Sequence, residues 1–116
     1  TSRYLKGADS DDDTIITKIG NFIFSTLGKI LFSLGLSDIL FTYILGKTKS
    51  FQSLNLKSLD FCLCVEIPVK AKRMKASYLD IPSHERKRIA GVKKVNEFRD
   101  GLKILFYMIK LFIRIK

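Results

Sequence analysis

"TIITKIGNFIFSTLGKILFSLGL", residues 14–36, predicts one long helix. On a period of about 3.6 residues its polar positions share one narrow stripe, and apolar side chains cover roughly three quarters of the circumference. The polar stripe holds Thr17, Lys18, Asn21, Ser25, Gly28 and Lys29, and the apolar remainder holds Ile15, Ile16, Ile19, Phe22, Ile23, Leu27, Ile30 and Leu31. Because a free surface helix would not expose so much apolar surface, we expect this helix to be buried between protein layers or to lie partly against lipid.

The segment ahead of this helix, ADSDDD at residues 8–13, predicts a polar loop. Its aspartates suit the positive end of the helix dipole, and Thr14 is the expected N-cap. Asp9 and Asp11 form a literal D-x-D, and paired carboxylates bind Mg²⁺ or Mn²⁺. Four aspartates directly before a helix are more typical of a solvated cap, so we expect no metal site in this loop.

Shorter segments on both sides predict alternating strands and helices. Strands are expected at Ser2 to Gly7, Ile39 to Leu45 and Ser77 to Ser83, a short helix within residues 46–61, and a cationic helix over residues 69–76 with Pro68 in its first turn. A basic loop follows, and then a helix from Val95 to Ile115. The order strand, helix, strand, helix, strand, loop, helix is typical of an α/β architecture.

The last helix is amphipathic and cationic. Asn96, Arg99, Asp100, Lys103, Tyr107, Lys110 and Arg114 fall on one stripe, and Phe98, Leu102, Leu105, Phe106, Ile109, Phe112 and Ile113 lie mostly opposite. Such a helix can lie in a membrane interface, with Arg99, Lys103, Lys110 and Arg114 facing the lipid headgroups. The alternative is an ordinary helix docked on the sheet, and the sequence leaves both open.

Charge is concentrated in the second half of the chain. The 116 residues carry a net charge of +10, with fourteen Lys and Arg against four Asp and Glu in residues 70–116 and seven of each in residues 1–69. A one-sided basic surface indicates an anionic partner, which can be nucleic acid, an anionic membrane or a phosphorylated substrate. Because no run of about 18 or more uncharged apolar residues is present, we expect no membrane-spanning segment.

The two cysteines, Cys62 and Cys64, are spaced too closely for a zinc site or a C-x-x-C redox pair. We interpret both as small buried residues in a protein of a reducing compartment. Ser83, His84 and Glu85 are sequence neighbours that cannot converge as a catalytic triad, so His84 is expected at the surface.

The basic loop lies within HERKRIAGVKKVNEFRDGLKIL, residues 84–105. Arg86, Lys87, Arg88, Lys93 and Lys94 flank Gly91. A glycine allows close approach of the backbone to a ligand, and the guanidinium fork of arginine matches phosphate oxygens. The loop therefore predicts a phosphate clamp, although a solvated run of charges has the same composition.

This segment resembles the C-terminal signature of family 2 glycosyltransferases, of the dolichyl-phosphate mannose synthase and bacterial polyprenyl-phosphate or cell-wall type. Four further segments are similar to family motifs in the same order, namely SRYLKG, TKIGNFIFSTLGKILF, SDILFTYILGK and VEIPVKAKRMKASYLDIPS. The sequence differs at Lys93, where the family has serine, at FTYILG, which lacks the glycine and arginine of G-[YF]-R, and at Asp80, where the family has glutamate. The resemblance spans nearly the whole chain.

The resemblance implies a GT-A (nucleotide-diphospho-sugar transferase-like) fold, a nucleotide-diphospho-sugar donor, a divalent metal and a lipid-phosphate or cell-envelope acceptor. Residues 1–94 would be the C-terminal portion of the catalytic domain, and residues 95–116 the interfacial helix at the cytoplasmic face of a membrane. We expect a fragment whose nucleotide pocket and metal-binding D-x-D precede Thr1, so that it is inactive alone. The membrane attachment would be peripheral or through segments outside this chain.

The family's functional positions carry over to specific residues. Donor-diphosphate binding is implied for Arg88, with Gly91, Lys93 and Lys94 beside it, and acceptor-phosphate binding for Arg3, Lys18 and Asn21. Asp38 matches an aspartate near the acceptor and is the catalytic candidate, and no metal ligand is expected within the chain. The rival hypothesis is a non-catalytic basic module that binds anionic lipid or nucleic acid. Nucleic acid is disfavoured because the phenylalanines lie mostly in helical apolar faces rather than on strands.

Overall fold

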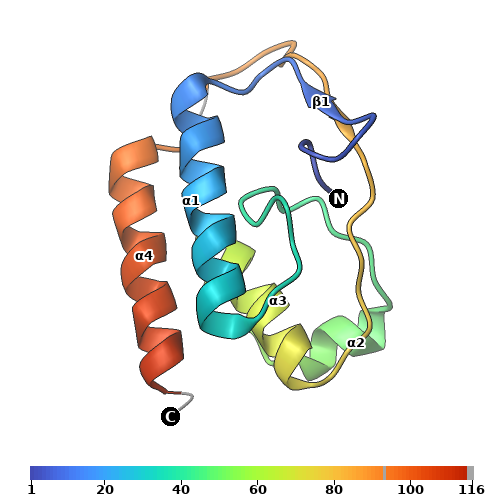
Figure 1. Ribbon diagram of the computed structural model, residues 1–116, viewed down its shortest axis with the longest axis vertical. Coiled ribbons are helices and arrows are strands. Elements are labelled where there is room, and N and C mark those ends of the chain that lie inside the picture. Colours follow the sequence, from blue (N-terminus) through green and yellow to red (C-terminus); the bar gives the residue numbers. More distant parts are fainter. Residues whose placement is uncertain (93, 115–116) are drawn as a thin grey trace.

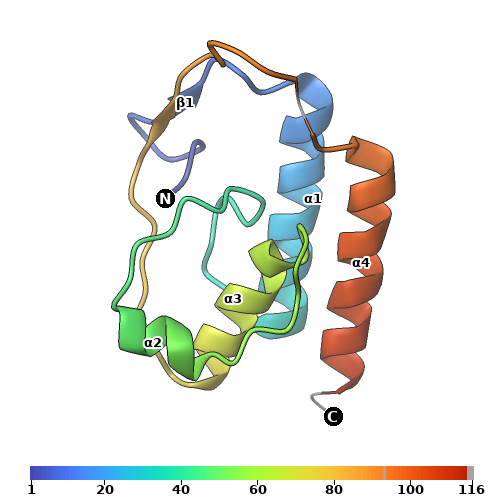
Figure 2. The same ribbon diagram turned by 180° about the vertical axis from the view of Figure 1, so that it is seen from behind.

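Two long helices that run side by side in the same direction dominate the fold (Figures 1 and 2). The computed structural model describes residues 1–92 and 94–114. Its elements are β1 (Asp9–Ser10), α1 (Ile15–Phe32), α2 (Thr48–Ser53), α3 (Leu63–Arg73), β2 (His84–Glu85) and α4 (Glu97–Ile113). Both α3 and α4 pack against α1. The two short strands and the loops around them lie beyond the first turns of α1 and α4.

The start of α1 is as predicted, and its end comes earlier. The side chain of Thr14 caps the helix by accepting a hydrogen bond from the backbone N–H of Thr17. The helix ends at Phe32 because Ser33 adopts a left-handed conformation with φ of 55°. The N–H groups of Ser33 and Leu34 then bond back to Lys29 and Gly28, which closes the last turn and directs Leu34 into the core.

Part of the polar stripe of α1 faces the protein interior, whereas Lys18 and Lys29 at its edge are exposed. Asn21 and Gly28 are buried, whereas the isoleucines and Phe22 on the other side are exposed. The amide of Asn21 donates to the carbonyl of Ser37 and accepts from the N–H of Leu40, each at 3.1 Å. At Gly28 an added Cβ would lie 3.0 Å from the side chain of Ile39, so glycine permits this close approach. Asn21 and Gly28 therefore form the surface of α1 on which residues 37–40 pack.

The core lies between α1, α3 and α4. Its buried members are Phe32, Leu34, Ile39, Cys64, Val65, Val69, Ile104, Met108 and Leu111. Burial of Cys62 and Cys64 is confirmed, although both lie at the start of α3. The predicted position of Pro68 is wrong, because α3 begins at Leu63 and Pro68 lies inside it. Residues 63–68 extend the helix because Val65 and Val69 complete an apolar face against the core.

Most of the predicted strands do not form. In the described residues 2–7, 39–45 and 77–83, pairing is limited to one isolated parallel bridge between Ser2 and Pro82. The parallel pair β1 and β2 joins Asp9 to His84 and Ser10 to Glu85, inside segments expected to be loops. A strand needs a neighbour for its ladder of hydrogen bonds, and Ile39 to Leu45 have none in the described part of the chain.

The C-terminal helix forms close to its predicted bounds. It begins at Glu97 rather than Val95, because Asn96 caps it by accepting from the N–H of Arg99. Asp100 in turn accepts from the N–H of Asn96 at 2.9 Å. This reciprocal cap explains why Asp100, expected on the polar stripe, is buried. The helix ends at Ile113, and Ile115, the predicted last helical residue, lies outside the described residues.

Candidate functional site

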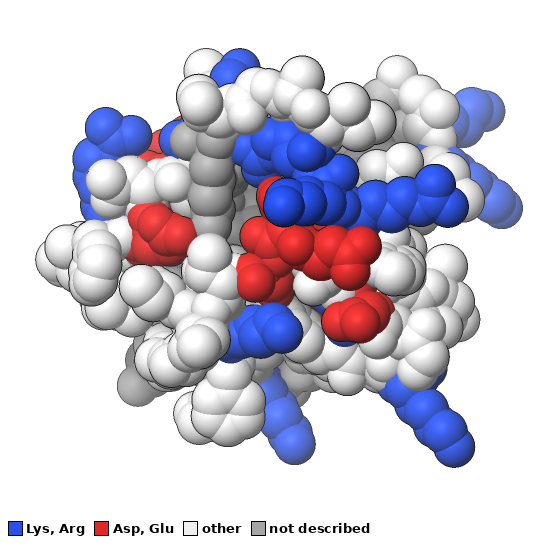
Figure 3. All heavy atoms as spheres, turned by 90° about the horizontal axis from the view of Figure 1, so that it is seen from above, with Lys and Arg blue, Asp and Glu red and all other residues white. Residues whose placement is uncertain are grey.

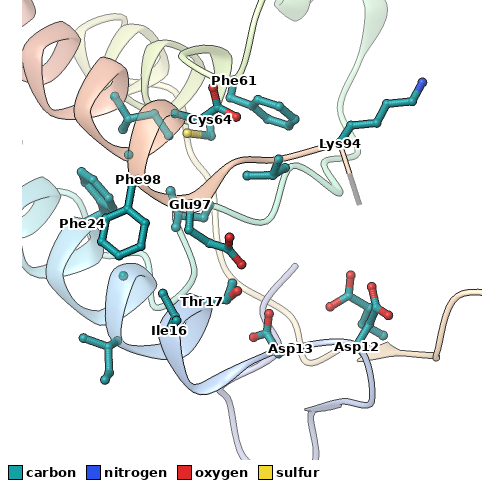
Figure 4. A pocket seen from close by; sticks show the side chains of 18 of the residues that line it. Asp12, Asp13, Ile16, Thr17, Phe24, Phe61, Cys64, Lys94, Glu97 and Phe98 are labelled. Atoms are coloured by element: carbon teal, nitrogen blue, oxygen red, sulfur yellow. The ribbon is translucent and has the colours of Figure 1, made fainter. Parts of the chain in front are cut away.

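A cavity of about 1000 Å³ opens between the first turns of α1 and α4 and the two loops that precede them. Its walls are mostly apolar and include Ile16, Ile23, Phe24, Phe98 and Ile104. Figure 4 shows Phe24, Phe98 and Ile16 along the helices, with Asp12 and Asp13 at the opposite side near the acidic loop. The charged residues of the lining are Arg3, Asp12, Asp13, Glu85, Arg88, Lys94, Glu97 and Asp100. The cavity therefore joins apolar walls to a rim that carries charges of both signs.

Arg3 is the centre of a buried network at the cavity rim. Its Nε and Nη2 bond to the two oxygens of Asp38 at 2.7 and 3.0 Å, and Nη1 bonds to Asp13 and Glu85, each at 3.0 Å. The guanidinium also lies 4.5 Å from the ring centroid of Phe41. Burial alone would lower the pKa of Arg3, but the hydrogen bonds and charges of the three carboxylates raise it above its ordinary value. Arg3 is therefore a fixed cation that orders three acidic side chains.

Tyr4 extends this network to the surface. Its hydroxyl donates to Asp13, and burial together with that hydrogen bond raises the pKa of Tyr4 above its ordinary value. The hydroxyl of Ser10 in β1 donates a hydrogen bond of 2.6 Å to the carboxylate of Glu85 in β2. The acidic side chains around Arg3 are thus held in place from two elements.

The basic loop contributes Arg88, Gly91 and Lys94 to the cavity lining. Gly91 has φ of 86°, a left-handed conformation that favours glycine, so its presence has a backbone reason. Nη2 of Arg88 lies 3.1 Å from Oδ2 of Asp12. Lys93, the remaining predicted member of the clamp, lies outside the described residues.

The acidic and basic loops face each other at one end of the molecule. Figure 3, which looks onto this end, shows Asp and Glu side chains gathered directly beside Lys and Arg side chains. His84 is exposed, as expected, and contacts Asp11 at 3.1 Å. Among the described lining residues, carboxylates outnumber cations. The carboxylates are Asp12, Asp13, Glu85, Glu97 and Asp100, and the cations are Arg3, Arg88 and Lys94. Part of the basic charge is therefore neutralised by the chain itself.

The predicted site residues divide into those the fold brings together and those it separates. Arg3, Arg88, Gly91 and Lys94 share the cavity, and Asp38 is buried directly behind Arg3. Lys18 is exposed on the outer side of α1, and Asn21 is used by residues 37–40. The roles of all these residues in donor or acceptor binding stay predictions.

Large apolar side chains are exposed along both long helices. On α1 they are Ile15, Ile16, Ile19, Phe22, Ile23 and Ile30, and on α4 they are Phe98, Leu102, Phe106, Ile109 and Ile113. Helical geometry places exposed Lys18 and Lys29 along one edge of this surface, and exposed Arg99, Lys103, Lys110 and Arg114 along the other. We call this surface the two-helix face. Contiguous exposed apolar surface of this kind is typical of a protein or membrane contact.

The length and composition of α1 alone would allow it to cross a membrane. It has 18 residues and a mean hydropathy of 1.3, with 17% of the segment buried, and it is the one helix among the described residues that meets these criteria. A single such helix is weak evidence for a span, and α1 contains two lysines. Its inner stripe bonds to residues 37–40, so its exposed side alone is available to lipid.

The cysteines and carboxylates narrow the chemistry of the site. Burial raises the pKa of Cys64, which lines the cavity, to about 12 and that of Cys62 to about 11. Neither thiol is therefore a ready nucleophile at neutral pH. Among the described residues no group of three metal-ligating side chains is suited to hold an ion. Asp12 and Asp13 are bonded to arginines, so they do not fit a metal centre.

Several residues of the site were not predicted. Asp12, Asp13 and Glu85 were assigned to a solvated cap or to no role, yet they bind the predicted cations. Asp80 was noted only as a substitution, and its carboxylate accepts from the N–H of Ser37 at 2.7 Å. The available signal was the chain's charge pattern, with an acidic loop before one helix and a basic loop before the other.

Comparison of the chain with protein-family models, with curated proteins and with solved structures gives no match. The function is therefore inferred from the residues and their geometry.

Proposed function

We propose that the chain is part of a glycosyltransferase that moves a sugar from a nucleotide-diphospho-sugar donor to a lipid-phosphate or cell-envelope acceptor at a membrane surface. The observation that carries the proposal is the position of the cavity. It combines Arg88, Gly91 and Lys94 at its rim with apolar walls that continue into the two-helix face. Arg88 and Lys94 could contact an anionic group, and the apolar walls a lipid chain. The order of the family-like motifs supports the same reaction.

Arg88 and Lys94 have the chemistry that the leaving group needs. Transfer of the sugar places negative charge on the departing diphosphate, and cationic side chains fixed beside it stabilise that charge in the transition state. Arg88 can form two parallel hydrogen bonds to phosphate oxygens, whereas Lys94 contributes a point charge. In this proposal the nucleotide pocket and the divalent metal would be supplied by residues outside this chain.

Arg3 and Asp38 have a more indirect place in the proposed reaction. Asp38 is 3% exposed and bonded to Arg3 through both oxygens, so its side chain is held in one orientation. Arg3 also lines the cavity. Together with Lys18 and Asn21, Arg3 is proposed for acceptor-phosphate binding by resemblance, and its neutralisation by three carboxylates makes it the weaker of the two arginine assignments.

Arg88→Ala in the intact protein tests the proposal. Turnover of sugar transfer should fall by about 10² to 10³, the usual scale for removal of one charge-stabilising group. Arg88→Lys should restore only part of the rate, because an ammonium lacks the bidentate contact. Arg86→Ala removes the same charge from an exposed position of the same loop outside the cavity lining and is the matched control. Equal turnover in wild type and Arg88→Ala would refute the assignment.

A non-catalytic module that binds anionic lipid is the second candidate. It is favoured by the two-helix face, which has apolar side chains in the middle and cations at both edges. Nucleic acid fits this face less well, because six of its exposed apolar residues on α1 would stay in water. Binding to anionic vesicles without any sugar transfer by the intact protein would select this candidate.

A further inference from the structure

The arginine assigned to phosphate binding is paired with a carboxylate of the chain itself. Nη2 of Arg88 lies 3.1 Å from Oδ2 of Asp12, and the two side chains are 37% and 26% exposed. Both residues line the cavity. An anion that enters the cavity and the carboxylate of Asp12 therefore compete for one guanidinium.

The neighbouring carboxylates are held much more firmly. Asp13 and Glu85 both bond to Arg3, whose side chain is 6% exposed, and Asp13 also accepts from Tyr4. Their separation from Arg3 would leave Nη1 of a buried guanidinium without its two acceptors, which is costly. The pair between Asp12 and Arg88 lies nearer the surface, where ion pairs contribute little and water can replace either partner. Asp12 is thus the carboxylate of this rim that a ligand can displace without disturbing the buried network.

We propose that Asp12 is a positioning residue that holds Arg88 at the rim of the cavity and competes with phosphate groups of a ligand for it. The proposal rests on the proposed function for the identity of Arg88 as the phosphate contact. Asp12 lowers the affinity of the cavity for a diphosphate, and its ion pair with Arg88 forms again when the diphosphate leaves. In sugar transfer this competition speeds release of the nucleotide product. Donor binding is weakened by this competition only at Arg88, because the other contacts of the donor are not affected by it.

The excess of carboxylates in the cavity makes this competition more effective. Five described carboxylates and three described cations line it, so each added negative charge of a ligand meets a repulsive field. Removal of one carboxylate therefore acts in two ways, since it frees Arg88 and reduces the repulsion. A purely structural role for Asp12 predicts the opposite sign, because loss of its contact with Arg88 would disorder the loop and weaken binding.

Titration calorimetry of the 116-residue chain with inorganic pyrophosphate tests the proposal. At low salt, Asp12→Asn should bind pyrophosphate about three- to tenfold more tightly than wild type, on the scale of one partly exposed ion pair. Asp12→Ser should show the same direction, and Asp12→Glu should stay near wild type because it keeps the competing charge. In the background Arg88→Ala, the change Asp12→Asn should have less than a third of its effect.

Asp11→Asn is the matched control, because it removes the same charge from the same loop but pairs with His84. An equal gain in Asp11→Asn, weaker or unchanged binding in folded Asp12→Asn and Asp12→Ser, or no pyrophosphate binding by any of these variants would overturn the proposal. Far-ultraviolet circular dichroism identifies variants that fold. The proposed function is tested separately, because the competition is measured without a sugar donor, and a protein with the Asp12 effect but no transfer activity would lose the glycosyltransferase assignment alone.

Discussion

Glu66 is fully buried in α3 and joins this helix to residues 57–58 of the loop that precedes it. Its carboxylate accepts from the N–H groups of Lys57 and Ser58, each at 2.8 Å, and pairs with Lys70 at 2.7 Å. Burial alone would raise the pKa of Glu66, but these contacts lower it from its ordinary value of 4.5 to about 2. The folded chain therefore binds this proton less tightly than the unfolded chain.

The sign of this shift predicts a loss of stability in acid. The contribution of Glu66 is complete above pH 4.5 and disappears as the pH falls toward 2, and by linkage it amounts to roughly 3 kcal/mol. Urea unfolding of wild type and Glu66→Gln should show a difference in free energy of unfolding that shrinks by about this amount between pH 6 and pH 2. Parallel pH profiles for the two proteins would show that Glu66 is not the group responsible.

At the level of single residues, the cations of the site could be predicted and their partners could not. Arg3 and Arg88 stand out by charge, by motif and by the glycine beside the basic loop. Their carboxylate partners are distant in sequence, since Asp12 lies 76 positions from Arg88 and Glu85 lies 82 positions from Arg3. Nothing in a periodic pattern links such positions, because the pairing depends on where the chain turns.

Among the elements, the two long helices followed from the sequence, whereas the start of α3 and the strands did not. The periods of residues 14–36 and 95–115 and their Thr and Asn caps are local, so the sequence alone predicts α1 and α4 within a few residues. A strand depends on a neighbour that local patterns do not reveal. The orientation of α1 was also not predictable, because Asn21 and Ser25 of its polar stripe face inward and bond to residues 37–40.

The C-terminal helix provides a test of membrane contact. Lys103, Lys110 and Arg114 are exposed, and each cation near an anionic surface contributes about 1 kcal/mol at modest ionic strength. Changing all three to Glu should release the chain from vesicles with anionic lipid in a flotation assay, with little effect on its thermal midpoint. Added salt should weaken wild-type binding, because it screens these charges.

A matched variant shows whether membrane release depends on the position of the substituted cations or only on the net charge of the chain. Lys6, Lys47 and Lys49 are exposed away from the two-helix face, and their change to Glu alters the net charge equally. This control should stay bound to the vesicles. Retention of the α4 variant, or equal release of both variants, would contradict an interfacial role for α4.

On the scale of the whole molecule, the described residues form a helical body and a charged end with different kinds of support. The body is held by apolar contacts between α1, α3 and α4. The end is held by ion pairs around Arg3 and by a short parallel ladder. The cavity lies at their junction, so its walls are set by packing and its rim by charge. The GT-A fold expected from the resemblance stays a prediction.

The short parallel ladder has a consequence for the order in which the chain folds. It joins positions 75 residues apart, and closing a loop of that length costs about 4 kcal/mol in chain entropy. The backbone N–H groups of Ser2, Asp9, Asp11 and Ser83 bond between residues 2–11 and 81–85, and at roughly 1 kcal/mol each these four bonds alone barely offset this cost. The end therefore depends on the ion pairs of Arg3 as well, and it has few of the apolar contacts that hold the helices. We therefore expect the N-terminal segment to order last and to open first. In native-state hydrogen exchange, the amides of Ser2 and Asp11 should exchange through local opening at least tenfold faster than that of Met108, and equal rates would contradict this order. The rim of the cavity can then detach and re-form while the helices stay folded.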